Sequence, residues 1–383
     1  MSLFSQRAER TGSDSMKWQK YAGSDILPMW VADMDFPAAP PIIEALRERV
    51  EHSVFGYSLP NTELPEVVCT YFQRRWRWQI EPEWITFSPG LGVALHTVCR
   101  MNGLERGGIV TPRPIYTAFR NAPAWAGKRM IEVGFRLDQT TGSWLLDDPA
   151  AAAAAGGGAD ILMLCNPHNP NGKVFGRKEL EALAAAAEAG DWLICADEVH
   201  ADLILERDCR HFPIASLAPE ISRRTITLQS PSKAFNLPGL NFGVVVIEDE
   251  KLRNRYRQAA RGQVIDQLNP LGMAAGQAAW SGNCDEWLKQ LIDHLRANRD
   301  LISEAIAAID GISMPHLAAT YLAWMDVSAL NLADASAHFI RHRLGMSPGA
   351  QYGDNSFMRL NFGTDRKTVQ EACRRLANAA QAA

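Results

Sequence analysis

Several features that would mark a special class of protein are missing from this sequence. No apolar run reaches the roughly 18 residues of a membrane-spanning helix, and the opening stretch MSLFSQRAERTGSDSMKW carries charges where a secretory signal has its apolar core. A basic excess is missing too, since 39 Lys and Arg face 43 Asp and Glu, for a net charge of −4. We therefore expect a cytoplasmic protein that binds neither membranes nor nucleic acid.

Patterned cysteines, internal repeats and long biased segments are also missing. The 7 cysteines include no CxxC pair and no regular spacing, which indicates neither a disulfide framework nor a zinc site. The one low-complexity tract, at 148–160, is rich in alanine and glycine, and we interpret it as a surface helix and turn. The 47% of hydrophobic residues is ordinary for a globular chain with a well-buried core.

Short apolar runs alternate with helical stretches from Trp84 onward. Seven of them read as strands: WITFS, GGIVT, RMIEVGF, ADILMLC, DWLICAD, TITLQS and FGVVVIE. Strands that alternate with helices favour an α/β fold, with a mainly parallel sheet covered by helices on both faces. The sequence thus predicts a mainly parallel seven-stranded sheet.

The pattern changes after Asn269 and Pro270, where long helical periodicity is followed by the strand-like run TYLAWMDV. We expect a large α/β domain at 49–275 and a smaller α+β domain at 276–383. The N-terminal segment 1–48 is expected to join the smaller domain.

Ligands of such sheets bind beyond the carboxyl ends of the strands, so the residues that follow each run are the candidates for chemistry. SPGLGVAL places Leu91 and Gly92 at a helix N-terminus, which suits a phosphate group but also an ordinary tight turn. It is not a dinucleotide fingerprint, because the third glycine position falls on Leu95. Asn169 lies in the run CNPHNPNGKVF, which has more turn-forming residues than one turn requires. This excess favours a second role, in which an Asn side-chain amide lies beside a ligand hydroxyl.

CADEVHADL places Asp197, Glu198 and His200 at another strand end. A carboxylate that directly follows WLICA is costly to bury without a cationic partner, unless this strand end is simply exposed. Asp197 and Glu198 point to opposite sides of an extended chain, so we expect no metal site.

QSPSKAFNLPGL places Ser230, Ser232 and Lys233 after a further strand. A lysine there can form a Schiff base if burial and nearby positive charge lower its proton affinity, and the two serines suit a phosphate. Arg359, in MRLNFGT, has a planar fork that fits a carboxylate, with a structural ion pair as the alternative. Together these groups match the requirements of pyridoxal phosphate.

The order of the motifs NPxNPxG, DExHxDL, SxSKxFNxxG and RLNFG resembles the fold-type I pyridoxal-phosphate enzymes of the class I/II aminotransferase superfamily. The resemblance covers roughly residues 15–375. Within the superfamily, PMWVADMDF at 28–36 and FGYS at 55–58 resemble the cystathionine β-lyase branch of C–S lyases. The resemblance implies fold type I, with a large and a small domain.

The resemblance also implies roles around the cofactor ring. Lys233 would be the Schiff-base lysine and the base that takes the α-proton, and Asp197 would hold the pyridine nitrogen. Asn169 would bind the ring oxygen, with His200 where aspartate aminotransferases have a tyrosine that also meets this oxygen. Tyr116 would stack on the ring face.

The remaining implied contacts concern the phosphate and the substrate. Leu91 and Gly92 would offer backbone amides to the phosphate, and Ser230 and Ser232 their side chains. Tyr57 would reach the phosphate from a neighbouring subunit, which implies a homodimer with active sites at the subunit interface. Arg359 would bind the substrate carboxylate, and the pocket that selects the substrate side chain would include Trp30 and Tyr57.

The branch resemblance implies β-elimination of cysteine thioethers, with cystathionine giving homocysteine, pyruvate and ammonia. Asn241 occupies the position where many aminotransferases place a phosphate-binding arginine, which favours the lyase interpretation. An amino-acid aminotransferase is the alternative activity, because the early steps are shared. A binding or regulatory protein that retains the fold and the cofactor is the alternative of another class.

Overall fold

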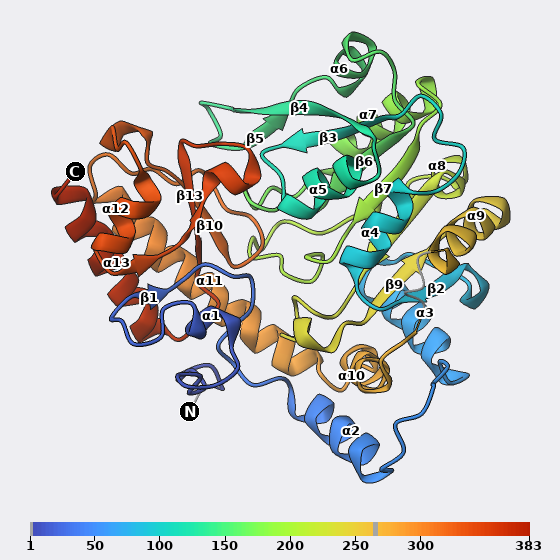
Figure 1. Cartoon of the computed structure of the whole chain (residues 1–383), viewed down its shortest axis with the longest axis horizontal. Helices are drawn as coiled ribbons and strands as arrows, with labels where there is room; N and C mark the ends of the chain where they lie inside the picture. Colours follow the sequence, from blue (N-terminus) through green and yellow to red (C-terminus); the bar gives the residue numbers. More distant parts are fainter. Residues whose placement is uncertain (1–2, 263–266) are drawn as a thin grey trace.

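The computed structural model describes residues 3–262 and 267–383. Figure 1 shows a large region built on a central sheet beside a smaller one, in which the red C-terminal elements meet the blue N-terminal segment. The 23-residue helix α11 (Asp285–Ala307) crosses from the large region to the small one. The division into domains at residues 48 and 275 stays a prediction.

The large region is built on an eight-stranded sheet in the order β2-β9-β8-β7-β6-β3-β4-β5. Of the eight strands, β9 and β5 run opposite to the other six, which confirms the mainly parallel sheet. The strands are β2 (Ile85–Ser88), β3 (Gly108–Arg113), β4 (Arg129–Leu137), β5 (Trp144–Leu146), β6 (Ile161–Cys165), β7 (Leu193–Asp197), β8 (Thr225–Gln229) and β9 (Gly243–Val246). All seven predicted strands form. The eighth, β5, was missed because three residues at a sheet edge are too few to show a periodic pattern.

Helices cover both faces of this sheet. One face carries α4 (Leu91–Cys99), α5 (Thr117–Trp125) and α9 (Glu250–Arg261), and the other α6 (Pro149–Ala155), α7 (Arg177–Ala189) and α8 (Pro219–Arg223). Strands β6 and β8 are buried along their whole length, as expected for apolar strands between two helical layers. The alanine-rich tract forms α6, whose cap Asp148 accepts from the backbone N–H groups of Ala150 and Ala151, so the predicted surface helix is confirmed.

The smaller region combines the C-terminal elements with the start of the chain. A three-stranded antiparallel sheet has the order β10-β13-β12, and β1 pairs with β11 in parallel. Its elements are β1 (Leu27–Pro28), β10 (Leu322–Asp326), α12 (Ala335–Arg341), β11 (Leu344–Gly345), β12 (Ser347–Pro348), η5 (Gly349–Tyr352), β13 (Phe357–Asn361) and α13 (Arg366–Gln381). The N-terminal segment therefore packs on strands that are made more than 300 residues later.

Four further helices complete the described fold: α1 (Met16–Gln19), α2 (Pro40–Glu51), α3 (Glu63–Trp76) and α10 (Pro270–Trp280). Both α2 and α3 pack on α10. Among the helices described, none combines the length and the apolarity needed to cross a membrane.

Residues 29–36, which we call the N-terminal strap, pass between the two regions. Asn361 donates from Nδ2 to the backbone oxygens of Val31 and Asp33. Asn236 bonds the strap from the large region, with Oδ1 accepting from the Met34 N–H and Nδ2 donating to Met34 O and Phe36 O. The strap is thus held from both sides, and this fixes its backbone at the edge of the cavity described next.

Candidate active site

A cavity of about 480 Å³ lies at the carboxyl edge of the large sheet. It is closed by the N-terminal strap and by β13 of the smaller region. The structure brings eleven of the twelve predicted site residues to its wall: Trp30, Leu91, Gly92, Tyr116, Asn169, Asp197, His200, Ser230, Ser232, Lys233 and Arg359. Most of them follow strands of the large sheet at its carboxyl edge, which is where a ligand site is expected in a sheet of this kind, and Trp30 and Arg359 come from the strap and β13.

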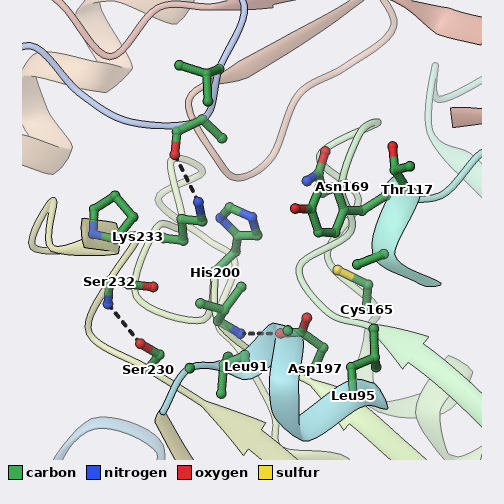
Figure 2. A pocket seen from close by; sticks show the side chains of 18 of the residues that line it. Leu91, Leu95, Thr117, Cys165, Asn169, Asp197, His200, Ser230, Ser232 and Lys233 are labelled. Atoms are coloured by element: carbon green, nitrogen blue, oxygen red, sulfur yellow. Dashed lines mark hydrogen bonds between the residues drawn. The ribbon is translucent and has the colours of Figure 1, made fainter. Parts of the chain in front are cut away.

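Lys233 projects into the cavity from the turn that follows β8, and its Nζ donates to Ala32 O of the strap at 2.9 Å. Figure 2 shows this bond above the cavity, with the His200 imidazole beside the amine. Burial lowers the pKa of Lys233 to about 8, and the positive charge of Arg359 adds to this shift. A substantial fraction of this amine is therefore neutral, and nucleophilic, slightly above neutral pH.

Asp197 ends β7, and its Oδ1 accepts from the backbone N–H of Val199 at 3.1 Å. Burial raises its pKa to about 6. Glu198 turns the other way and bonds His211 at 2.9 Å, as the alternation of an extended chain predicts. Within the described part of the chain no cation lies within 4 Å of Asp197, so the carboxylate is set to receive a positively charged ligand group.

Arg359 lies on β13, where burial lowers its pKa. Its Nη1 donates to Asn169 Oδ1 at 2.9 Å and its Nη2 to Trp30 O at 3.0 Å, while Cζ lies 4.7 Å from the centre of the Tyr352 ring. Its Nε is buried without a partner, and no carboxylate pairs with the guanidinium among residues 3–262 and 267–383. The predicted alternative of a structural ion pair is therefore wrong, and a guanidinium without a carboxylate partner at the cavity wall suits a ligand carboxylate.

Asn169 and His200 complete the wall around Lys233. Because Asn169 Oδ1 accepts from Arg359, its Nδ2 is left to donate to a ligand oxygen. Burial, and then the charges of Lys233 and Arg359, lower the pKa of His200 to about 3, so its ring is neutral. Its Nδ1 is buried without a partner. Tyr116, whose N–H donates to Asn169 O at 3.1 Å, lies half-exposed at the cavity wall.

The start of α4 also lines the cavity, where an anion was predicted to bind. Gly90 takes φ +106°, which a residue with a side chain rarely adopts, and this turns the chain sharply from β2 into the helix. The first helical amides, of Leu91 and Gly92, have no intrahelical acceptor and carry the positive end of the helix dipole. They can therefore hold a phosphate.

The two serines differ in what they have left to offer. Ser230 Oγ donates to Phe242 O at 2.6 Å and accepts from the Ser232 N–H at 3.1 Å, so its only hydroxyl proton is already in use. Figure 2 shows the second of these bonds. The Ser232 hydroxyl is the one free to donate, and the phosphate role predicted for the Ser230 side chain stays a prediction.

Tyr57 is the twelfth predicted site residue, and in the single chain it does not line the cavity. Its side chain is 93% exposed, on the segment that follows α2 in Figure 1. Its predicted role in a neighbouring subunit stays a prediction. The backbone oxygen of Trp30 accepts from Arg359, and its indole N–H donates to Lys17 O at 3.1 Å.

Sequence reasoning missed three residues that shape this site. The Tyr352 ring lies against the Arg359 guanidinium. Asn236 and Asn361 donate hydrogen bonds to the strap that carries Ala32. Both asparagines stood inside recognised motifs, SKAFN and RLNFG. Asn236 adopts φ +56°, a conformation that asparagine tolerates better than most residues, and this could have singled it out.

Comparison with known proteins defines the class. The family described as aminotransferase class I and II matches residues 24–376, and the chain belongs to this family. Cystathionine beta-lyase PatB of Bacillus subtilis (strain 168) is 33% identical over 384 residues, which span 97% of this chain and 98% of that protein. The solved structure of OvoB is 40% identical, with a TM-score of 0.95 and 99% of both chains covered. Cystalysin from Treponema denticola, solved with a pyridoxal 5′-phosphate cofactor, is 25% identical, with a TM-score of 0.92, and covers 100% of this chain and 99% of its own.

Proposed function

We propose that this protein is a pyridoxal-phosphate-dependent C–S lyase that cleaves cysteine thioethers by β-elimination. From cystathionine and water it yields homocysteine, pyruvate and ammonia. One observation carries the proposal: Lys233, Asp197 and Arg359 are buried around one cavity, and each lacks a counter-charge within ion-pair distance in the described chain. An amine, an anion and a guanidinium fork complement an aldehyde, a basic ring nitrogen and an amino-acid carboxylate.

The wall of the cavity fits pyridoxal phosphate group by group. Lys233 would hold the aldehyde carbon, and the unpaired carboxylate of Asp197 would hold the ring nitrogen. The free Nδ2 of Asn169 and the neutral His200 would bind the ring oxygen, and Tyr116 would stack on the ring. The amides of α4 and the Ser232 hydroxyl receive the phosphate. When bound, this cofactor supplies an electron-withdrawing ring that stabilises negative charge on the substrate Cα.

The chain's own groups then bind the substrate and move its proton. The Arg359 fork binds the α-carboxylate, and its hydrogen bond to Asn169 fixes the fork in one orientation. Lys233 Nζ, neutral once released, takes the proton from Cα as general base, for which a pKa of about 8 is well matched. Charge on Cα then expels the β-sulfur with the electrons of the C–S bond. The strap and β13 cover part of the cavity, and the water they exclude strengthens these contacts.

The assembly and location proposed for the protein follow from two groups of residues. The segment after α2 exposes four large apolar side chains, which favours its burial against a second copy: Val54 61%, Phe55 58%, Tyr57 93% and Leu59 87%. We take this copy to form a homodimer with shared active sites. All seven cysteines are unpaired, which suits the reducing cytoplasm.

The deciding experiment supplies L-cystathionine alone to the purified enzyme and measures pyruvate, ammonia and homocysteine. A lyase forms the three products in equal amounts over many turnovers. Arrest after about one turnover, with activity restored by a keto acid, would instead make the protein an aminotransferase. A protein that binds the cofactor and turns over neither cystathionine nor other thioethers of cysteine would support the binding or regulatory alternative.

A further inference from the structure

A second cavity, of about 860 Å³, lies outside the active site. Its walls are the end of α3 (74–77), the segment 201–212 that follows β7, and the first turns of α11 (285–296), and we call it the arginine groove. Its volume is in the range of sites that bind small molecules. The mechanism proposed above uses none of these residues.

The charge of the arginine groove contrasts with the charge of the chain. Eight of its lining side chains are Arg or Lys and three are Asp, although the whole chain carries a net charge of −4. Cations gathered in a concave surface repel one another, and the low-dielectric walls strengthen the field. This concentration of positive charge lowers the stability of the fold unless an anion is bound there.

Five of the eight cations of the groove are paired with a carboxylate. The three aspartates are used by Arg74, Arg75 and Arg296, which approach Asp285, Asp202 and Asp293 to 3.2, 2.9 and 2.6 Å respectively. Two other cations pair with glutamates outside the groove.

The three cations of the groove that are not paired in this way are Arg77, Arg207 and Arg210. All three are exposed, and none has an acidic partner within 4 Å among the residues described. Arg210 lies over the Phe212 ring at 4.4 Å, which holds its fork in place without neutralising it. Three guanidinium groups are therefore free to bind an anion.

The floor of the groove adds an independent observation. The His211 side chain lines the groove and is almost fully buried, with its Nδ1 unpartnered. Its Nε2 bonds Glu198 Oε2 at 2.9 Å, and Glu198 Oε1 accepts from the Ile214 N–H at 3.2 Å, so the ring is fixed. The fixed ring makes this part of the groove wall rigid.

We propose that the arginine groove binds an oligophosphate, meaning a small ligand with two or more linked phosphate groups. Guanidinium forks bind phosphate oxygens with two parallel hydrogen bonds each, and several forks around one hollow match several linked phosphates. A long nucleic acid fits less well, because the rest of this acidic chain would repel it. The site is distinct from the phosphate site at the start of α4.

The test titrates tripolyphosphate, and separately ATP without magnesium, into the enzyme saturated with pyridoxal phosphate, with calorimetric detection at low salt. Saturation with cofactor keeps the probe away from the α4 site, and an unchanged visible spectrum verifies this. We expect saturable binding that weakens as salt rises. Equal affinity for both probes would identify the phosphates alone as the ligand, and tighter binding of ATP would identify a nucleotide. Both results support the proposal.

Charge reversal then locates the site. Arg207→Glu with Arg210→Glu should weaken tripolyphosphate binding by about a hundredfold, at roughly tenfold for each arginine that is replaced. The matched control is Arg100→Glu, at an exposed arginine outside the groove, which should leave the affinity unchanged. If the double variant does not fold, Arg77→Gly replaces it, since glycine suits φ +55° at this position.

Three results would overturn the proposal. They are the lack of saturable binding by the wild type, undiminished binding by the groove variants, and an equal loss of affinity in Arg100→Glu. Binding of a single-stranded DNA oligonucleotide, but not of tripolyphosphate, through these arginines would also overturn it. The measurement does not depend on turnover, so it stands whether or not the protein is a lyase.

Discussion

Arg359 Nη1 donates to Asn169 Oδ1 across 2.9 Å, although 190 residues separate the two in the chain. The bond joins the proposed ligand of the substrate carboxylate to the proposed ligand of the cofactor ring oxygen. It also decides which way the Asn169 amide faces, because the acceptor oxygen is taken and only Nδ2 can serve the cavity. Substrate binding and cofactor binding are therefore expected to be coupled through this pair.

Arg359→Lys should raise the KM for cystathionine by about 10- to 100-fold, with a smaller effect on kcat. A lysine supplies one point of charge where the arginine supplies a fork, so the variant forms about one charged hydrogen bond fewer. Steady-state kinetics of pyruvate formation measures this. Arg113→Lys is the control, since Arg113 donates to Gly353 O outside the cavity and should leave KM near the wild-type value. An unchanged KM in Arg359→Lys would count against the carboxylate role.

Asp197→Asn should lower turnover by about 30- to 1,000-fold, because a neutral amide cannot stabilise a protonated ring nitrogen in a buried site. In the cofactor-free protein, the same substitution should instead raise the free energy of unfolding. The folded pKa of about 6 lies above the ordinary value of 3.8, so ionised Asp197 destabilises the empty fold as pH rises through this window. Above pH 6 the variant should be more stable by about 3 kcal/mol.

Urea denaturation of the cofactor-free proteins at pH 5 and pH 7.5 measures this difference, which should shrink at the lower pH. Pyridoxal phosphate should then stabilise the wild type more than Asp197→Asn. A stability difference that grows toward low pH would contradict the assigned charge state, and near-wild-type turnover would falsify the proposed contact with the ring.

Lys233 should be the most reactive lysine of the cofactor-free protein near neutral pH. With its pKa lowered to about 8, its labelling by trinitrobenzenesulfonate should reach half its maximal rate near pH 8. Arg359→Gln removes a nearby positive charge and should move this midpoint upward. Peptide mapping identifies the labelled site. Lys233→Ala should abolish the early labelling, together with any borohydride-reducible link to the cofactor, whereas Lys251→Ala, at an exposed lysine, should change neither.

Tyr57→Ala should weaken cofactor binding by about tenfold or more, if its hydroxyl bonds the phosphate of a second subunit. Mixing the variants Tyr57→Ala and Lys233→Ala under conditions that exchange subunits tests the sharing directly. Half of the dimers are then mixed, and each contains one intact site, so about a quarter of the wild-type activity should return. No recovery, with subunit exchange verified by mass, would place Tyr57 outside the partner's site.

The strand-end motifs allowed most of the cavity wall to be predicted, for a physical reason. Parallel strands deliver their carboxyl ends to one edge, so Asn169, Asp197 and Lys233 had to meet once their strands were recognised. Backbone acceptors carry no comparable signature, because any residue type can supply them. Ala32 O was therefore missed as the acceptor for Lys233, and Phe242 O as the acceptor for the Ser230 hydroxyl.

The arginine groove could not be predicted for a related reason. Arg77, Arg207 and Arg210 come from two distant segments, and the short basic run RRWR at 74–77 does not by itself indicate that residues 207–210 lie beside it. Only the packing of α3 beside the segment after β7 brings the three charges to one hollow.

The N-terminal strap has a consequence for the order in which a newly made chain becomes active. A ribosome releases residues 29–36 early, but Asn361, which clamps the strap oxygens of Val31 and Asp33, emerges about 330 residues later. The large sheet can assemble in the meantime, since its strands are complete by Val246. The strap gains its bonds to Asn361 only after the large sheet and Asn236, which holds the strap from the other side, have been made. A nascent or truncated chain can therefore have the lysine and most of the cofactor pocket while it still lacks a closed chamber for the reaction.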